Sequence, residues 1–538
     1  MFPRIKSFKN KDGSWRHYLF LVATKRIAGR VRQVTVANFG RLEEVDKILP
    51  DVVEKLAKFS KTLRVINLSK EMSNDWVKDY GIVLIFKKIW EILGLDKYFA
   101  KARQTKKNKF DIGGLVWAMV LNRIHEPSSE LSTQEWMKRV YGIKEVKDVT
   151  RLYRSLDFLI GHKEEMERYL YAAGGDLFSQ DLDMVLMDTT SVVYFGEGEK
   201  ADSLLDYGYS KEKRFDLKQV IVGVLMTKDG IPIGHEVYPG NTNDVTAFEH
   251  MITEVKNKFK IRRVIIVCDR GMVSEKNIQA LEKQEYEYII GMRMRQLAKD
   301  KADKILSKTD MKSLSSSLSG KEVEFEGRRL VVCFNQEEAI KDKSKREEII
   351  ARLKEKLKTQ GLKSLLIHRE YSKYLKIKAE KPEIDEDVIK REELFDGKFV
   401  LQSNTKFKWQ DIILAYKGLW QIEACFRALK SELEMGPIYH FTERRIRAHI
   451  FICFLALILK VVFQKELLKI DKSVSVNKVL EDVKKIKAVQ ITLKDMPIVL
   501  RTELEGQAYK AFKAVGLKIP PRILNNPTDT PENVVVRL

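Results

Sequence analysis

Hydrophobic and polar residues alternate with a strand period at the start of the chain and with a helix period further along. Residues 15–24, WRHYLFLVAT, and residues 31–38, VRQVTVAN, are rich in β-branched and aromatic residues and flank the basic connection KRIAGR, which predicts a hairpin. From residue 75 to about residue 175 the apolar positions recur with the period of a helix, as in WVKDYGIVLIFKKIWEILGL. A small basic β module followed by a helical region is therefore expected.

A second change of pattern, at residue 183, predicts a sheet. Three apolar runs rich in β-branched residues, DMVLMDTTSVVYF, LKQVIVGVLMT and IPIGHEVYPG, predict successive strands. NDVTAFEHMITEVKNKF then predicts a helix, RRVIIVCDRGM a strand, SEKNIQALEKQ a helix and YEYIIGM a strand. The order β-β-β-α-β-α-β predicts a mixed sheet with helices packed on it, which places this part of the chain in the α/β class.

Regular alternation stops after Arg293 and resumes with KFVLQSN at residue 398. The stretch between them contains KEVEFEGRRLVVCF and the charged helix REEIIARLKEKLKTQ, so an inserted subdomain with strands of its own is predicted rather than a plain loop. We therefore divide the chain into a basic β module with a linker (1–74), a helical region (75–180), the first part of the α/β core (181–292), the insertion (293–397), the second part of the core (398–470), and a C-terminal helical region with an extended arm (471–538). The strongly cationic connection KARQTKKNK within the helical region leads us to expect that this region binds DNA.

Residues 416–433, YKGLWQIEACFRALKSEL, predict one amphipathic helix with two neighbouring stripes. At about 100° per residue, the polar stripe falls within roughly 40° of one line and the apolar stripe lies beside it. The polar stripe consists of Tyr416, Trp420, Glu423, Arg427 and Lys430, and the apolar stripe of Ala415, Leu419, Ile422, Phe426, Leu429 and Leu433. The apolar stripe anchors the helix on a core. Ordinary surface pairs between charges three and four residues apart would also explain the polar stripe.

The net charge points to a polyanionic partner. Among 538 residues, 98 Lys and Arg outnumber 76 Asp and Glu by 22. Nucleic acid suits such a chain because its phosphates bind basic surfaces with release of counterions. A Lys/Glu-rich surface typical of high growth temperature would explain the 32% of charged residues but not their positive excess.

Cysteine spacing and hydropathy predict an intracellular protein. Cys268, Cys333, Cys425 and Cys453 lie far apart without metal-ligand spacing, which favours buried thiols in a reducing cytoplasm. The basic start, MFPRIKSFKNKDGSW, has no apolar segment of the kind that a signal peptide requires. The most apolar run, AHIFICFLALILKVVF, is shorter than the roughly 20 residues that span a bilayer, so a buried core helix and no membrane partner are predicted.

Three carboxylates are candidates for a metal site. Asp188 lies in the strand-like run VLMDTTS, and Asp269 ends the strand VIIVCDRG, where a sheet exposes its carboxyl edge. Glu423 lies on a helix that must pack beside the same sheet. Carboxylates converging from separate parts of the chain bind hard cations such as Mg²⁺. Each Asp alone is equally explained as a turn or cap residue, and Gln219, on the strand beside Asp188, either approaches this site or is satisfied in the core.

These residues, in this order, resemble the DDE transposases of the RNase H-like superfamily, in the insertion-sequence branch (family four type) marked by a Tyr-x2-Arg-x3-Glu-x6-Lys signature. Tyr416, Glu423 and Lys430 match that register, whereas Leu419 stands where the signature has Arg; Arg427 is expected to supply the missing backbone contact. The resemblance also covers MDTTS, GHEVYPGNTNDVTAF, CDRGM and the long insertion, over roughly residues 180–465.

The resemblance implies an RNase H-like core in which Asp188, Asp269 and Glu423 bind two Mg²⁺ ions, with Mn²⁺ as a substitute, while Tyr416, Arg427 and Lys430 contact DNA. It further implies cut-and-paste transposition, partners in double-stranded DNA with terminal inverted repeats and in target DNA, a homodimer, and a place at the nucleoid of a prokaryotic cell. Two alternatives stay open: another RNase H-like nuclease such as a resolvase, and an inactive DNA-binding derivative.

Overall fold

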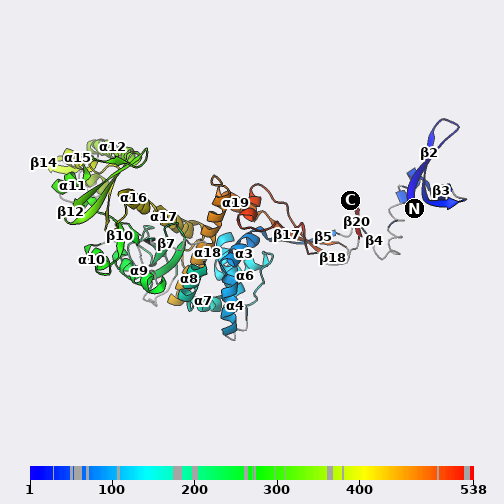
Figure 1. Ribbon diagram of the computed structural model, residues 1–538, viewed down its shortest axis with the longest axis horizontal. Helices are drawn as coiled ribbons and strands as arrows, with labels where there is room; N and C mark the ends of the chain where they lie inside the picture. Colours follow the sequence, from blue (N-terminus) through cyan, green and yellow to red (C-terminus); the bar gives the residue numbers. More distant parts are fainter. Residues whose placement is uncertain are drawn as a thin grey trace. The chain divides into compact units, whose positions relative to one another are not determined.

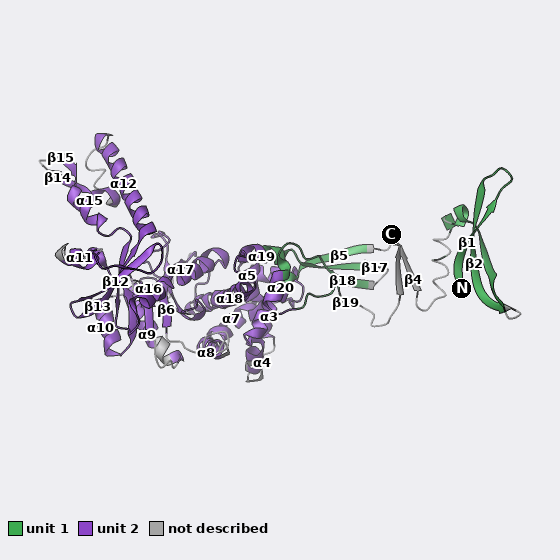
Figure 2. Cartoon of the chain, turned by 45° about the horizontal axis from the view of Figure 1, so that its top comes forward, with its two compact units in different colours: residues 1–81, 481–509, 518–538 green, residues 82–480, 510–517 purple. Residues whose placement is uncertain are grey.

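The computed structural model describes most of the chain in two compact units (Figure 2). Unit 1 comprises residues 1–81, 481–509 and 518–538, and unit 2 comprises residues 82–480 and 510–517. The described residues are 1–27, 30–45, 47–48, 53, 63–67, 72–105, 110–173, 184–196, 204–259, 265–269, 271, 274–296, 299–307, 309–359, 368–378, 381–493, 496–525 and 533–537.

Unit 1 consists mainly of three small sheets. The first joins β1 (Phe2–Lys9), β2 (Trp15–Ile27) and β3 (Arg30–Arg41) in that order, so the predicted hairpin is confirmed and β1 is an additional strand. The second has the order β19 (Ile523–Asn525), β18 (Met496–Arg501), β17 (Lys487–Leu493) and β5 (Met72–Asp79), and the third pairs β20 (Asn533–Arg537) with β4 (Leu63–Asn67).

Two expectations about this unit are corrected by its second sheet. Residues 75–79 form a strand rather than the start of the helical region, because β5 pairs with β17, a partner about 410 residues away whose pairing no local pattern reveals. The C-terminal region was expected to be helical, but it contributes β17, β18 and β19 as well as α19 (Val476–Lys484) and α20 (Ala508–Ala514).

The helical part of unit 2 is built around α18 (Glu443–Ile470). The helices of the predicted helical region are α3 (Gly81–Ile92), α4 (Leu95–Thr105), α5 (Ile112–His125), α6 (Glu130–Lys138), α7 (Thr150–Ile160) and α8 (Lys163–Ala173). Within the described residues α18 is the one helix long and apolar enough to cross a membrane, yet 83% of its most apolar window is buried inside the protein. A helix that is apolar on all sides belongs in a core, as predicted.

The α/β part of unit 2 is one nine-stranded mixed sheet with the order β11-β12-β13-β16-β10-β9-β6-β7-β8. The predicted order of elements is confirmed by β6 (Met184–Val193), β7 (Gln219–Thr227), β8 (Pro232–Pro239), α9 (Asp244–Phe259), β9 (Ile265–Cys268), α10 (Glu275–Lys283) and β10 (Glu287–Gly291). β9 runs parallel to β6 and β10, whereas β6, β7 and β8 pair antiparallel. Figure 1 labels β7, β10 and β12 of this sheet. β6 and β9 are thus parallel neighbours in the middle of the sheet, and the position of the candidate active site described below depends on this pairing.

Helices cover both faces of this central region. On one face α9 and α10 pack on alternate strand residues, so that Val185, Met187 and Cys268 share a buried cluster with Phe248 and Leu281. The other face, which carries the intervening residues, lies against α16 (Trp409–Lys417) and α17 (Trp420–Arg427). Along β6 and β9, the residues that alternate with those of the buried cluster therefore point toward α16 and α17.

The stretch 293–397 contributes strands to the same sheet. β11 (Lys312–Ser313), β12 (Leu318–Phe325) and β13 (Arg328–Asn335) extend it through β16 (Lys398–Ser403), which pairs with both β13 and β10. The remaining elements of the stretch are a short 3₁₀ turn (Met294–Gln296), α11 (Lys299–Leu306), α12 (Gln336–Thr359), α14 (Arg369–Ser372), the hairpin of β14 (Leu375–Lys378) with β15 (Lys381–Ile384), and α15 (Glu386–Glu393). This stretch was expected to form an inserted subdomain with strands of its own, but three of its strands, β11, β12 and β13, belong to the main sheet.

The segment 416–433 is not the single α-helix that its periodicity predicts. α16 ends at Lys417, α17 begins at Trp420, and a π-helical turn (Ala428–Glu432) follows. Gly418 and Leu419 keep helical dihedral angles between the two helices, so the apolar stripe largely survives: Ile422, Phe426, Leu429 and Leu433 are buried. A π-turn is wider than an α-helical turn. The residues after Arg427 therefore face a different direction around the helix axis from the one that an unbroken α-helix would give them.

Buried charge ties α8 to the edge of the sheet. The Glu167 carboxylate accepts hydrogen bonds from the backbone N–H and Nδ1 of His235, the latter at 2.9 Å, and forms ion pairs with Lys258 and, at 3.3 Å, with Lys163. Burial alone would raise the pKa of Glu167, but Lys163, His235 and Lys258 hold that pKa well below its ordinary value. A buried carboxylate with this many partners stays ionised and joins three elements.

Replacing Glu167 by Ala is expected to lower the free energy of unfolding by about 3–5 kcal/mol, because Lys258 would be left buried without its main partner. Urea unfolding followed by circular dichroism measures the change. The matched control is Glu164→Ala on the same helix, where an exposed carboxylate lies 4.0 Å from Arg168 and a change below about 0.5 kcal/mol is expected. Equal effects of the two substitutions would contradict this account.

Candidate active site

Strand register brings Asp188 and Asp269 together. In the parallel pairing of β6 with β9, Met187 lies opposite Cys268, so the next residue of each chain segment, Asp188 and Asp269, lies side by side. Both follow residues of the buried cluster by one position and therefore point to the opposite face, toward α16 and α17. The predicted meeting of these two carboxylates is a direct consequence of the sheet.

Tyr416 and Glu423 reach the same place from the two helices. The hydroxyl of Tyr416 on α16 donates a 2.8 Å hydrogen bond to Oδ1 of Asp269, and its ring stacks on Phe399 of β16 with centroids 6.0 Å apart. A pocket of about 310 Å³ is lined by Asp188, Asp269, Phe399, Tyr416, Lys417, Leu419, Trp420 and Glu423. All three predicted carboxylates thus line one pocket, together with Leu419, the residue that departs from the signature.

The surroundings of Asp188 disfavour its ionised form relative to that of an ordinary aspartate. Burial is the largest cause that raises the pKa of Asp188 to about 6, and the negative charges of Asp244 and Asp269 act in the same direction. Lys211 and a 2.7 Å hydrogen bond from the Thr189 N–H act against this shift. Three carboxylates line the pocket, against one lining lysine, Lys417, and Lys211 beside it.

Sequence reasoning missed two charged residues beside the pocket. The ammonium of Lys211 lies 3.9 Å from Oδ1 of Asp188 and 4.0 Å from Oδ1 of Asp244, and it donates to the Thr189 carbonyl at 2.5 Å. Asp244 also accepts a hydrogen bond from the Thr189 hydroxyl. Asp244 is the first residue of α9, and the side chain of Asn243 before it caps that helix by accepting from the Thr246 N–H at 2.8 Å.

The other predicted site residues lie apart from the carboxylates. Lys430, in the π-turn, forms a 2.8 Å ion pair with Glu212. Arg427 is exposed and lines a different cavity, of about 510 Å³, beside Gly230 and Lys460. Gln219 is fully buried, and its Nε2 donates to the Gly240 carbonyl at 2.9 Å; it is absent from the residues that line the carboxylate pocket.

The donor set suits hard divalent cations. Carboxylate oxygens are the ligands that Mg²⁺ prefers, and a cation would offset the burial of Asp188 and its repulsion by Asp244 and Asp269, which together raise its pKa. Among the described residues, the one group of three His, Cys, Asp or Glu side chains whose ligand atoms all lie within 4.8 Å of one another is elsewhere, around Glu130.

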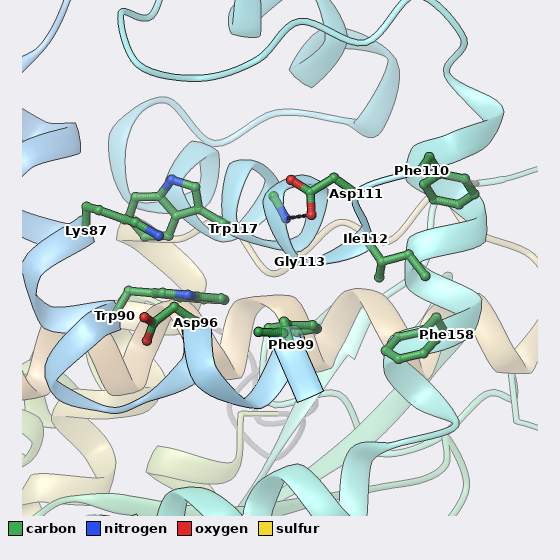
Figure 3. Close-up of a pocket in the computed structure, with 12 residues that line it drawn as sticks. Lys87, Trp90, Asp96, Phe99, Phe110, Asp111, Ile112, Gly113, Trp117 and Phe158 are labelled. Atoms are coloured by element: carbon green, nitrogen blue, oxygen red, sulfur yellow. Dashed lines mark hydrogen bonds between the residues drawn. The ribbon is translucent and has the colours of Figure 1, made fainter. Parts of the chain in front are cut away.

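A separate aromatic cavity, of about 580 Å³, lies among α3, α4, α5 and α7 (Figure 3). Trp90 and Phe99 stack nearly parallel in its wall, with ring centroids 5.8 Å apart, and Lys87 lies over the ring of Trp117. Asp111 caps α5 by accepting from the Gly114 N–H at 3.1 Å. This cavity shares no lining residue with the carboxylate pocket and contains no comparable set of carboxylates.

Comparisons with known proteins support the predicted family. The family described as "Transposase DDE domain" matches residues 179–459, which is more than half of the chain, and "IS1634 family transposase, N-terminal domain" matches residues 3–67. The second family is named IS1634, so the predicted assignment to family four is not confirmed. No curated protein matches the chain significantly. The matching solved structures include Argonaute of Marinitoga piezophila in complex with 5′ OH guide RNA, with 8% identity over 84% of this chain and 81% of that one; its TM-score of 0.19 is too low to indicate a shared fold.

Addition of Mg²⁺ is expected to stabilise the protein, because a cation that binds only the folded pocket shifts the unfolding equilibrium by about 2.7 kcal/mol at 100 times its dissociation constant. Differential scanning fluorimetry should show a rise of several degrees in Tm. Asp269→Asn should abolish the rise, whereas Asp216→Asn, at an exposed carboxylate paired with Arg214, should preserve it. An undiminished rise in the Asp269 variant would exclude this residue as a ligand.

Proposed function

The chain belongs to the DDE transposases of the insertion sequences, and from that premise we propose that it cuts its element out of DNA and joins the element to a new target. The single observation that carries the proposal is the pocket in which Asp188, Asp269 and Glu423 meet under the Tyr416 hydroxyl. Family membership brings with it action on DNA and dependence on a divalent metal. The cut-and-paste route and the roles of individual residues are our proposals.

Asp188, Asp269 and Glu423 would hold two Mg²⁺ ions, which when bound activate the attacking oxygen and stabilise the leaving oxygen of a phosphodiester. The residues of the chain have three tasks around that chemistry. The sheet fixes the two aspartates at adjacent positions, the buried stripe of α17 fixes Glu423 above them, and Tyr416 orients the Asp269 carboxylate through its hydrogen bond. Attack by water would cut at the element end, and attack by the freed 3′-hydroxyl would join it to target DNA.

DNA is proposed to run along the outer surface of α17 and the π-turn. Lys430 would leave Glu212 for a phosphate, since its ammonium is a compact point charge suited to that exchange. Tyr416 offers a hydroxyl donor and a ring face, and Arg427 extends the basic track on the exposed side of α17. Two ends must be held at once, so a dimer is proposed for the DNA complex.

The decisive test uses purified protein, Mg²⁺ and DNA carrying the element's terminal inverted repeats. Asp269→Ala should reduce cleavage and strand transfer by at least about a thousandfold, equivalent to about 4 kcal/mol in the barrier, while end binding in a gel-shift assay stays nearly unchanged. Asp216→Ala serves as the control and should retain activity. Cleavage without any joined product in the native protein would favour another RNase H-like nuclease, and absence of both would favour an inactive DNA-binding derivative.

Lys430→Ala is expected to weaken end binding and to reduce the slope of log K against log salt concentration by about 1, because one phosphate contact is lost. Arg427→Ala should behave in the same way if the basic track extends that far. Lys472→Ala, an exposed lysine outside the track, provides the control. An effect at Lys430 alone would remove Arg427 from the proposed contacts, and no effect at either would refute the track.

A further inference from the structure

Three side chains from separate parts of unit 2 meet away from the carboxylate pocket. Glu130 is the first residue of α6, His440 lies in the loop before α18, and His449 lies within α18. Nε2 of His440 lies 3.1 Å from Oε2 of Glu130, and Nδ1 of His449 lies 3.8 Å from Oε1 of the same carboxylate. Glu130 and His449 are buried and His440 is half-buried, so the cluster is shielded but still reaches solvent on the His440 side.

The orientation of His449 leaves one ring nitrogen for a ligand bond. Its Nε2 lies 3.0 Å from the carbonyl oxygen of Met435. A carbonyl only accepts, so Nε2 carries the proton and, in the neutral ring, Nδ1 presents its lone pair toward Glu130. A backbone carbonyl that accepts from the second ring nitrogen is the usual support of a metal-binding histidine, because it fixes both the tautomer and the plane of the ring.

The distances fit one tetrahedral ion. At zinc bond lengths of about 2.0–2.1 Å, neighbouring ligand atoms of a tetrahedron lie about 3.4 Å apart and two imidazole centres about 5 Å apart. Nε2 of His440 and Nδ1 of His449 approach different oxygens of Glu130, at 3.1 and 3.8 Å, and one ligand atom from each of the three residues lies within 4.8 Å of the other two. The ring centres of His440 and His449 are 5.5 Å apart with planes at 57°. Small side-chain adjustments would bring all three ligands to bonding distance.

We propose that Glu130, His440 and His449 form a zinc site, distinct from the Mg²⁺ pocket. Two imidazoles and one carboxylate are a mixed nitrogen and oxygen donor set, which selects Zn²⁺ over the hard cations that an all-carboxylate pocket prefers. Water would complete the tetrahedron on the half-buried side. The ion would pin the start of α6 to α18, and so would hold the helical part of unit 2 against its central helix.

Arg123 is the group that competes with this ion. Its Nη2 lies 3.4 Å from Nδ1 of His449, and its Nη1 donates to the Glu434 carbonyl at 3.3 Å. Both contacts are long, so the guanidinium is held loosely enough to turn away when an ion occupies Nδ1. Without metal, the same residues would form only a network of ion pairs around Glu130, and this is the alternative that the experiment must exclude.

The test is titration of the chelator-treated full-length protein with ZnCl₂ in isothermal titration calorimetry, with excess Mg²⁺ present to fill the other pocket. The proposal predicts about one zinc ion per chain at micromolar affinity or tighter, and a rise in Tm on zinc addition. His440→Gln, which replaces the least buried ligand, should weaken zinc binding at least about tenfold and remove the rise in Tm. Substitution with Co²⁺ should give the intense visible absorption of a four-coordinate ion in the native protein only.

Two controls separate this site from the proposed active site and from surface binding. Asp269→Asn should retain the zinc ion, since it changes only the carboxylate pocket, and His250→Gln should behave like the native protein because His250 lies on α9 outside the cluster. The proposal is overturned if the native protein binds no zinc, if His440→Gln binds it as tightly as the native protein, or if Asp269→Asn alone abolishes binding. Failure here would leave the transposase assays unaffected.

Discussion

The parallel pairing of β6 with β9 is the constraint on which the candidate active site depends. It sets Asp188 and Asp269 on neighbouring strands, which lie about 4.8 Å apart. Two carboxylates free in water would repel each other and stay further apart. Burial of the opposite face under α9 and α10 supplies the free energy that holds these strands in register. The hydrogen bond from Tyr416 to Asp269 and the ammonium of Lys211, 3.9 Å from Asp188, relieve part of the repulsion between the two carboxylates.

The sequence alone predicted most of the α/β core because each strand there is a nearly continuous apolar run. Such runs, bounded by turns, identify β6, β7, β8 and β9 without knowledge of their partners, and the aspartates follow from their places in those runs. Pairing between distant segments could not be predicted. β5 becomes a strand only through β17, and Lys211 approaches Asp188 through a loop whose sequence has no periodic pattern. Local periodicity carries no information about contacts of that kind.

The segment 416–433 shows how a correct pattern can coexist with a wrong element. Its apolar residues are buried as predicted. The α-helix is interrupted at Gly418 and Leu419, but both residues keep helical dihedral angles, so the apolar side chains before and after the interruption still point to the same side. Its polar residues diverge, so that Glu423 lines the carboxylate pocket, Arg427 another cavity, and Lys430 pairs with Glu212. A π-turn depends on hydrogen bonding that side-chain periodicity does not encode.

Strand β16 has a consequence for the order in which the protein can assemble. It lies between β10, which ends at Gly291, and β13, which lies in the stretch 293–397. During synthesis, the edge of β10 therefore stays unpaired until the ribosome has produced the hundred or so residues that follow it, and pairing across such a separation is slow. Residues 293–397 therefore cannot be removed without disturbing the main sheet. Deleting them together with β16 would leave β10, the neighbour of the strand that precedes Asp269, as an unpaired edge strand that could associate with other nascent chains.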